Sequence, residues 1–248
     1  MINPNASPAA GIAIAVVGAT GYVGGHIVGE ALRRGHTVLG LSRTPTTETA
    51  HGMTIQTGSI ENMALVESLA RETSTPIVAV PASLSGNPKL PSIVPELLDV
   101  VSRCSCRLGI DGGAGSLLAT LDGPRLVDTP AFPQAAKPEA LIQIDVLDQL
   151  RNSTSSADWF YLSPAAKFGS HSPGIRTGKY RVGKDVLLRD ENGESAISGD
   201  AWQQRFAIHR LKRRRGVGAH LLAVTLDREV PQPVLVAVGR IERSSQGR

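Results

Sequence analysis

The fold of this chain is decided near its start by the stretch Ile-Ala-Ile-Ala-Val-Val-Gly-Ala-Thr-Gly-Tyr-Val-Gly, residues 12–24. An unbroken apolar run ends in three glycines at three-residue spacing, Gly18, Gly21 and Gly24. A short apolar run that glycine ends is typical of a strand buried on both faces. The apolar residues after it recur with the period of a helix, and Gly35 is placed to end that helix. The stretch therefore predicts a strand, a tight glycine turn and a helix.

This turn has the chemistry of an anion-binding site. Gly18 permits a sharp reversal, Gly21 lets backbone approach a pyrophosphate, and Gly24 lets the helix lie close to the strand. Free N–H groups and the dipole at the helix start attract phosphates. Thr20 is placed to cap the helix or to contact a phosphate oxygen. The alternative is a tight turn that binds nothing, but the context of strand, glycine turn and helix favours a dinucleotide.

The second expected strand, residues 37–42, bears on the choice between NADP and NAD. NAD-specific sites place a carboxylate near the end of this strand, on the ribose 2′-hydroxyl. This chain has Ser42-Arg43-Thr44 there instead. A guanidinium pairs well with a phosphate, so NADP(H) is the predicted cofactor. The alternative is that Arg43 is only a solvated surface residue.

The rest of the chain continues to alternate between strands and helices. Further strands are expected at residues 53–57, 76–80, 107–110 and 158–162, and helices at 61–72, 92–103 and 138–151. This order predicts an α/β fold, a Rossmann-like doubly wound parallel sheet. We expect residues 11–200 to form a single domain, with a small substrate-side excursion after Pro164. A disordered lead-in is expected at 1–10 and a divergent basic segment at 201–248.

The spacing Gly18-Ala19-Thr20-Gly21-Tyr22-Val23-Gly24 resembles the atypical branch of the short-chain dehydrogenase/reductase superfamily. That branch includes NmrA-like regulators and NADPH-dependent flavin reductases similar to biliverdin-IXβ reductase. The segments 112–116, 128–130, 163–164 and 174–180 look like the same group, and the resemblance extends to about residue 200. Ser59 departs from it, because the family often has an aspartate there that reaches toward adenine. The turn and the resemblance together assign cofactor binding to Gly18, Ala19, Thr20, Gly21, Tyr22, Val23, Gly24, Ser42, Arg43, Ser59, Pro81, Ala82, Ser163 and Pro164.

The catalytic residues are less clear from the sequence. Short-chain dehydrogenases use a Tyr-x-x-x-Lys pair, and one match exists, Tyr180 with Lys184. We interpret it as a decoy, because that pair works on a helix and Tyr180 lies in a glycine-flanked, strand-like segment. Ser116, just past the fifth strand, is the candidate for orienting a substrate carbonyl; capping a turn is an equal alternative. Glycines at 112, 113 and 115 are expected to let this loop approach a ligand.

Without a strong proton donor, flavins are suitable acceptors, since their N5 takes hydride directly and solvent supplies the proton. The sequence thus favours an NADPH-dependent oxidoreductase acting on a small flavin or quinone-like molecule. Two alternatives stay open. One is a non-catalytic NADP-sensing regulator of the NmrA-like type. The other is an NAD(P)-dependent epimerase or dehydratase-like enzyme, which would need Tyr180.

Composition limits the remaining possibilities. The net charge of +4 is uneven: residues 201–248 carry +7 and the rest carries −3. The basic run 212–215 in this tail has three interpretations: a nucleic-acid patch, a solvated surface or the product of an altered reading frame. An altered frame or a divergent tail is favoured, so nucleic acid is expected to bind only non-specifically through this run. A helix is expected to begin near Ala201. No apolar run approaches the length of a membrane span. Cys104 and Cys106, expected on opposite faces of a strand, fit a reducing cytoplasm. No metal spacing is visible, and a monomer or a homodimer is expected.

Overall fold

The computed structural model describes residues 12–46, 51–84, 89–164, 181–183, 185–187 and 205–209. The α-helices are α1 (Tyr22–Arg33), α2 (Met63–Glu72), α3 (Leu90–Arg103) and α4 (Lys137–Asn152). The strands are β1 (Ala13–Val17), β2 (Thr37–Ser42), β3 (Met53–Thr57), β4 (Thr75–Val78), β5 (Arg107–Asp111), β6 (Asp158–Ser163), β7 (Arg181–Gly183) and β8 (Arg205–His209). The elements predicted through residue 162 are all present, and their ends lie within about two residues of the expected positions.

These strands form one sheet in the order β3-β2-β1-β4-β5-β6-β8-β7. The six strands from β3 to β6 are parallel to their neighbours, as expected for a doubly wound sheet. The order reverses between β1 and β4, because the chain leaves β1 toward β2 and later returns to β1's other side. In such sheets ligands bind outside the carboxyl ends of the strands at this reversal.

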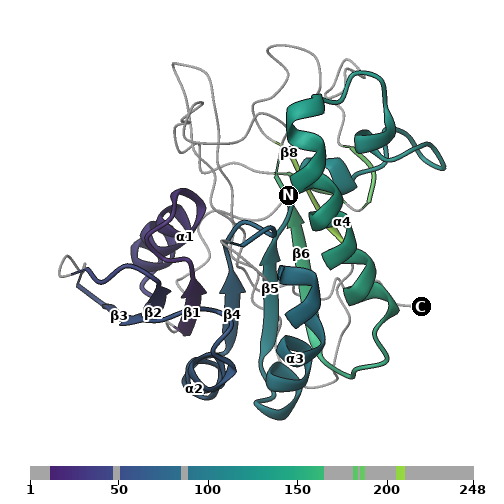
Figure 1. Ribbon diagram of the computed structural model, residues 1–248. Coiled ribbons are helices and arrows are strands. Elements are labelled where there is room, and N and C mark those ends of the chain that lie inside the picture. The colour runs from purple at the N-terminus through teal and green to yellow at the C-terminus, as the bar shows by residue number, and fades with distance from the viewer. Residues whose placement is uncertain are drawn as a thin grey trace, which may run out of the picture.

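Helices cover both faces of the sheet (Figure 1). On one face, α1 packs its buried residues against β1, β2, β4 and β6 in one apolar cluster. On the other face, α2, α3 and α4 form a larger cluster with the same strands and with β5. Buried on both faces, β1 reads as a continuous apolar run, which is why its sequence was diagnostic. The protein thus has a three-layer Rossmann-like architecture.

The segment near Ala201 differs from expectation. Instead of part of a helix, residues 205–209 form β8, which pairs antiparallel with β6 and parallel with β7. Part of the segment 201–248 therefore belongs to the sheet. Residues 1–11 and 210–248, including the basic run 212–215, lie outside the described residues.

The two cysteines also differ from expectation. Cys104 caps the end of α3 and Ser105 has a φ of 55°, so Cys104 and Cys106 do not share a strand. Both thiols are free, and burial raises the pKa of Cys106 to about 12. Among the described residues no helix is long and apolar enough to cross a membrane.

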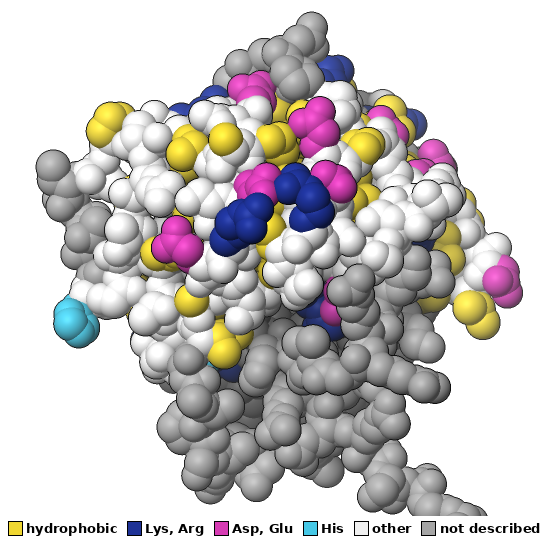
Figure 2. Space-filling model, turned by 90° about the horizontal axis from the view of Figure 1, so that it is seen from below, with side chains coloured by type: hydrophobic (Ala, Val, Ile, Leu, Met, Phe, Trp, Pro, Cys, Tyr) yellow, Lys and Arg dark blue, Asp and Glu magenta, His cyan; other side chains and the backbone are white. Residues whose placement is uncertain are grey.

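Ion pairs gather at the amino edge of the sheet, where α2 and α3 end. Glu67 of α2 accepts hydrogen bonds from Arg103 (2.7 Å) and from Arg71, and Arg103 also pairs with Asp99. Both hydrogen bonds lower the pKa of the Glu67 carboxyl, and the bond from Arg103 makes the larger contribution. Figure 2 shows basic and acidic side chains side by side on the face seen from below. These charges are paired with one another and are not arranged around a ligand. The candidate site therefore lies at the opposite, carboxyl edge of the sheet.

Candidate functional site

Two of the three glycines in the β1–α1 turn are required by the protein's own packing. Gly18 has a φ of +87°, and a Cβ there would overlap the carbonyl oxygen of Ala79. A Cβ at Gly24 would overlap the carbonyl of Gly18, so this glycine lets α1 lie directly against the turn. Both roles were expected from the sequence, and both are structural.

Gly21 is different. It is exposed, has an ordinary φ of −74°, and its Cβ would meet only the oxygen of Gly18, at 3.2 Å. A side chain is therefore nearly tolerated by the protein, so the space beside Gly21 is open toward solvent. The next amides, of Val23 and Gly24, are in the first turn of α1 and have no intrahelical acceptor. An open corner beside unfilled helix N–H groups fits a pyrophosphate.

Thr20 does not cap α1, in contrast to one of its two expected roles. No side chain caps this helix at its N-cap, Gly21. Instead the hydroxyl oxygens of Thr20 and Ser42 are 2.7 Å apart, which ties the turn to the end of β2. Ser42 is buried, whereas Arg43 is exposed just beyond it. Residues 42–46 contain no carboxylate, so an anion would meet a cation and hydroxyls here.

Ser59 lies past the end of β3, at the same edge. Its hydroxyl donates to the carboxylate of Glu61 (3.0 Å) and accepts from the Glu61 amide (3.3 Å). The hydroxyl is thus occupied within its own loop. Glu61 was not singled out from the sequence, although an acidic residue two positions after the usual aspartate was a visible signal.

The loop after β4 is held by a residue that the sequence reasoning missed. The carboxylate of Glu139, in the first turn of α4, accepts hydrogen bonds from the amides of Ala82 (2.6 Å) and Ser83 (3.3 Å). Pro81 is exposed and Ala82 is fully buried. The shape of the loop at the sheet's reversal point therefore depends on a helix that comes over 50 residues later.

The ends of β5 and β6 meet through two serines. The hydroxyl oxygens of Ser116 and Ser163 are 2.9 Å apart, and Ser116 donates to the carbonyl of Gly113 (2.8 Å). Both serines are buried, as is Pro164. The structure thus brings together two residues that the sequence placed at this edge separately. Because the Ser116 hydroxyl donates its proton to the carbonyl of Gly113, it caps the turn formed by residues 113–116. This is the alternative role that the sequence offered for Ser116.

Packing alone requires two glycines of the β5 loop, whereas the expected approach of this loop to a ligand stays a prediction. A Cβ at Gly112 would overlap the ring of Tyr161, and one at Gly115 would lie 2.9 Å from Ala140. Tyr161 donates to the carbonyl of Gln143 in α4 (3.0 Å), and burial raises its pKa. The loop is therefore shaped around a buried tyrosine that the sequence did not mark as special.

Asp111, the last residue of β5, is a further ionisable group at this edge. It is partly exposed, and its side chain makes no hydrogen bond or ion pair within the described part of the chain. Desolvation by the surrounding protein raises its pKa to about 7. The described residues hold no group of three or more His, Cys, Asp or Glu arranged for a metal ion.

Of the Tyr-x-x-x-Lys match at residues 180–184, the structure describes only residues 181–183. Residues Arg181–Gly183 form β7, so this part is a strand, as the sequence predicted. Tyr180 and Lys184 themselves lie outside the described residues.

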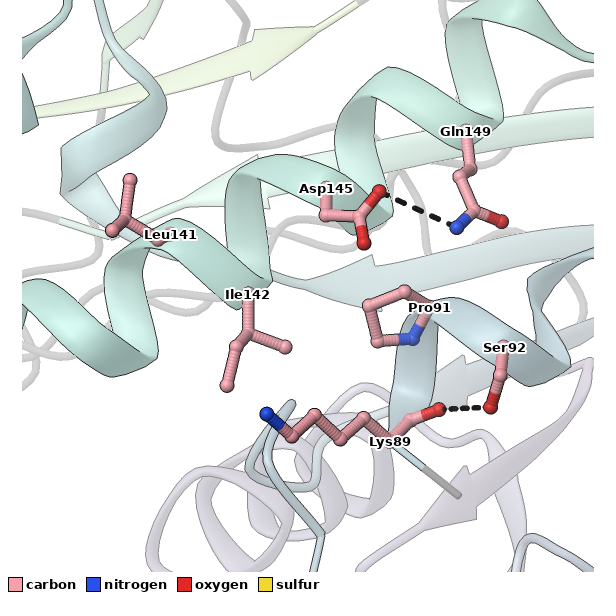
Figure 3. A pocket seen from close by; sticks show the side chains of 7 residues that line it. All are labelled: Lys89, Pro91, Ser92, Leu141, Ile142, Asp145 and Gln149. Atoms are coloured by element: carbon pink, nitrogen blue, oxygen red, sulfur yellow. Dashed lines mark hydrogen bonds between the residues drawn. The ribbon is translucent and has the colours of Figure 1, made fainter. Parts of the chain in front are cut away.

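A groove elsewhere includes none of the predicted site residues. It has a volume of about 870 Å³ and lies between α3 and α4. Figure 3 shows its lining, with the apolar side chains of Leu141, Ile142 and Pro91 beside Lys89 and the hydrogen-bonded pair of Asp145 and Gln149 (3.3 Å).

The fold and this edge define an NAD(P)-binding protein of the atypical short-chain dehydrogenase/reductase superfamily. Residues 14–91 match the NAD-dependent epimerase/dehydratase family, and these residues run from β1 to the start of α3. The chain belongs to the same family as the uncharacterised protein YwnB of Bacillus subtilis. It is 35% identical to YwnB over 191 residues, which are 75% of this chain and 85% of YwnB.

Solved structures agree with this assignment. A candidate epimerase from Bacteroides thetaiotaomicron is 26% identical with a TM-score of 0.64, and the match covers 82% of this chain and 99% of that one. A candidate NADH-flavin reductase from Streptococcus pneumoniae is also 26% identical, with a TM-score of 0.60 and coverage of 82% and 100%. The relatives thus share nearly their whole length with this chain but differ in the activities their names suggest.

Proposed function

We propose that this protein is an NADPH-dependent oxidoreductase that transfers a hydride to a flavin or quinone-like acceptor. The observation that carries cofactor binding is the open corner at Gly21 beside the unfilled N–H groups of α1. A glycine at a position where the protein itself nearly tolerates a side chain is best explained by a ligand that needs the space. The likeness to a candidate flavin reductase supports the acceptor class.

The choice of NADPH over NADH rests on the end of β2. There Arg43 is exposed, the hydroxyls of Thr20 and Ser42 are hydrogen-bonded to each other at the end of the strand, and residues 42–46 bring no carboxylate. A guanidinium and hydroxyls fit a 2′-phosphate, whereas a ribose diol is best held by a carboxylate.

The chain's own residues then have a limited task. The turn and first turn of α1 hold the phosphates, Arg43 fixes the adenosine end, and the Glu139-held loop and the Ser116–Ser163 pair shape the edge over β4, β5 and β6. The bound nicotinamide supplies the hydride. Positioning two rings at reacting distance is then the main contribution of the protein.

Two measurements test this proposal. NADPH and NADH are titrated by fluorescence into the unmodified protein, Arg43→Ala, and Arg71→Ala as a control at the opposite edge. NADPH should bind more tightly than NADH, and Arg43→Ala alone should remove the difference. Equal affinities in the unmodified protein would overturn the NADPH assignment.

NADPH oxidation against a panel of flavins, quinones and carbonyls tests turnover. Oxidation with flavins or quinones that persists in Tyr180→Phe supports the reductase. A loss of about 10²-fold or more in that variant with its fold preserved would favour an epimerase or dehydratase-like enzyme. Tight NADPH binding with no oxidation would favour a regulator.

A further inference from the structure

Asp111 faces the same side of the sheet as the glycine turn. Along β5, Leu108 and Ile110 are buried in the cluster that contains α2, α3 and α4. Side chains alternate along a strand, so Gly109 and Asp111 face the α1 side. Consistent with this, a Cβ at Gly109 would overlap the ring of Phe160, which packs in the α1 cluster.

Asp111 also lies close along the edge to the first glycine of the turn. β4 and β5 pair with Val78 beside Ile110, so the same register places Ala79 beside Asp111. The carbonyl of Ala79 lies against Gly18. Only the end of β4 therefore separates Asp111 from the turn that is proposed to hold the phosphates.

The surroundings leave Asp111 as an isolated acid. The strand ends at 17–21, 78–84, 111–117 and 162–164 contain one ionisable side chain, that of Asp111. Among the described residues, β4 has no ionisable side chain. The neighbouring strand β6 has Asp158 at its far end and Tyr161, whose side chain faces the other side of the sheet although burial and the charge of Asp111 both raise its pKa. On α1 the ionisable groups are Tyr22, His26, Glu30 and Arg33. Its raised pKa comes from desolvation.

We propose that Asp111 is the proton-exchanging residue of the cofactor site, a neutral acid beside reduced cofactor and a carboxylate beside oxidised cofactor. This inference rests on the proposed function. If Arg43 fixes the adenosine end over β2, the nicotinamide end extends past β1 toward β4 and β5, where Asp111 lies. The oxidised ring carries a positive charge that the reduced ring lacks, so only the oxidised ring favours an ionised Asp111.

The sign of the effect follows from this charge difference. A positive charge within about 4–6 Å lowers the pKa of a carboxyl group by about 1–3 units. Binding of NADP⁺ should therefore release a proton from Asp111, whereas binding of NADPH should not. By linkage, the affinity for NADP⁺ relative to NADPH rises with pH. Both cofactors carry the same 2′-phosphate, so its own titration cancels in this ratio.

The test measures dissociation constants for NADP⁺ and NADPH between pH 6 and 8.5, and does not depend on turnover. The ratio should shift in favour of NADP⁺ by about five- to tenfold over this range in the unmodified protein. It should change less than about twofold in Asp111→Asn. Asp145→Asn, which removes an exposed carboxylate on α4, should behave like the unmodified protein. Calorimetry at pH 7 in buffers of different ionisation enthalpy should show release of about 0.4–0.5 proton per NADP⁺.

The outcomes separate this inference from the proposed function. A ratio that does not vary with pH in the unmodified protein, or that varies equally in Asp111→Asn, overturns the role of Asp111 and leaves NADPH binding intact. Failure of the unmodified protein to bind either cofactor overturns the proposed function, and the role of Asp111 with it.

Discussion

The hydroxyl oxygens of Ser116 and Ser163 lie 2.9 Å apart, although the two residues are 47 positions apart in the chain. Each follows a parallel strand, and β5 and β6 are neighbours with Asp111 paired to Leu162. The hydrogen bond therefore joins the carboxyl ends of two strands on the side where α4 packs. It fixes the β5 loop relative to β6 independently of any ligand.

This relationship predicts an energetic coupling between the two serines. Ser116→Ala and Ser163→Ala should each lower the free energy of unfolding by about 1 kcal/mol, because each removes the hydrogen bond between the two buried hydroxyls. The double variant should lose less than the sum, with a coupling of about 0.5–1 kcal/mol. Urea denaturation of the four proteins measures this. Additive losses would show that the two hydroxyls do not depend on each other.

The three turn glycines should separate into two classes. Gly21→Val should abolish NADPH binding while the protein stays folded, because its side chain enters only the open corner. Gly24→Ala should lower the free energy of unfolding by about 1–3 kcal/mol, because its Cβ overlaps the Gly18 carbonyl. Thermal unfolding and NADPH titration measure both. A folded Gly21→Val variant with normal NADPH affinity would rule out phosphates at this corner.

The elements were predictable because their signals are local. β1, β2 and β4 are short apolar runs, and α1 to α3 carry apolar residues at helical spacing. Each signal can be read within a window of fifteen residues. The order of strands and helices then fixed a parallel sheet, and with it the edge where Gly21, Arg43, Ser116 and Ser163 lie.

Contacts between elements were not predictable in the same way. Glu139 reads locally as an acid in the first turn of a helix, and nothing near it indicates Ala82 as its partner. Tyr161 reads as one more buried residue, yet its packing explains Gly112. The strand β8 was missed because residues 205–209 stand in a basic segment, and their pairing with β6 is a long-range interaction.

The hold of Glu139 on the β4 loop gives a third prediction. Glu139→Ala leaves the amides of Ala82 and Ser83 without their acceptor and should lower the free energy of unfolding by about 1–3 kcal/mol. It should also weaken NADPH binding, because the loop lies where the nicotinamide end is proposed to extend. Glu139→Gln keeps an acceptor oxygen and should fall between the two proteins. Denaturation and NADPH titration of the three proteins measure this order; equal losses for Gln and Ala would contradict it.

Asp111 should make stability depend on pH in a defined direction. Its pKa in the folded protein is about 7, above the value of about 3.9 for an unfolded chain. The folded state therefore holds the proton more tightly, and the stability that this contributes is complete below about pH 4 and is lost as the pH rises to about 7.

A fully buried group would account for about 4 kcal/mol. The partial exposure of Asp111 reduces this to about 1–2 kcal/mol. Asp111→Asn has no charge to desolvate, so its advantage in unfolding free energy over the unmodified protein should grow by most of that amount between pH 4 and pH 8. Urea denaturation at the two pH values measures this difference, with Asp145→Asn as the control. A difference that stays the same at both pH values would show that Asp111 titrates as an ordinary surface carboxylate.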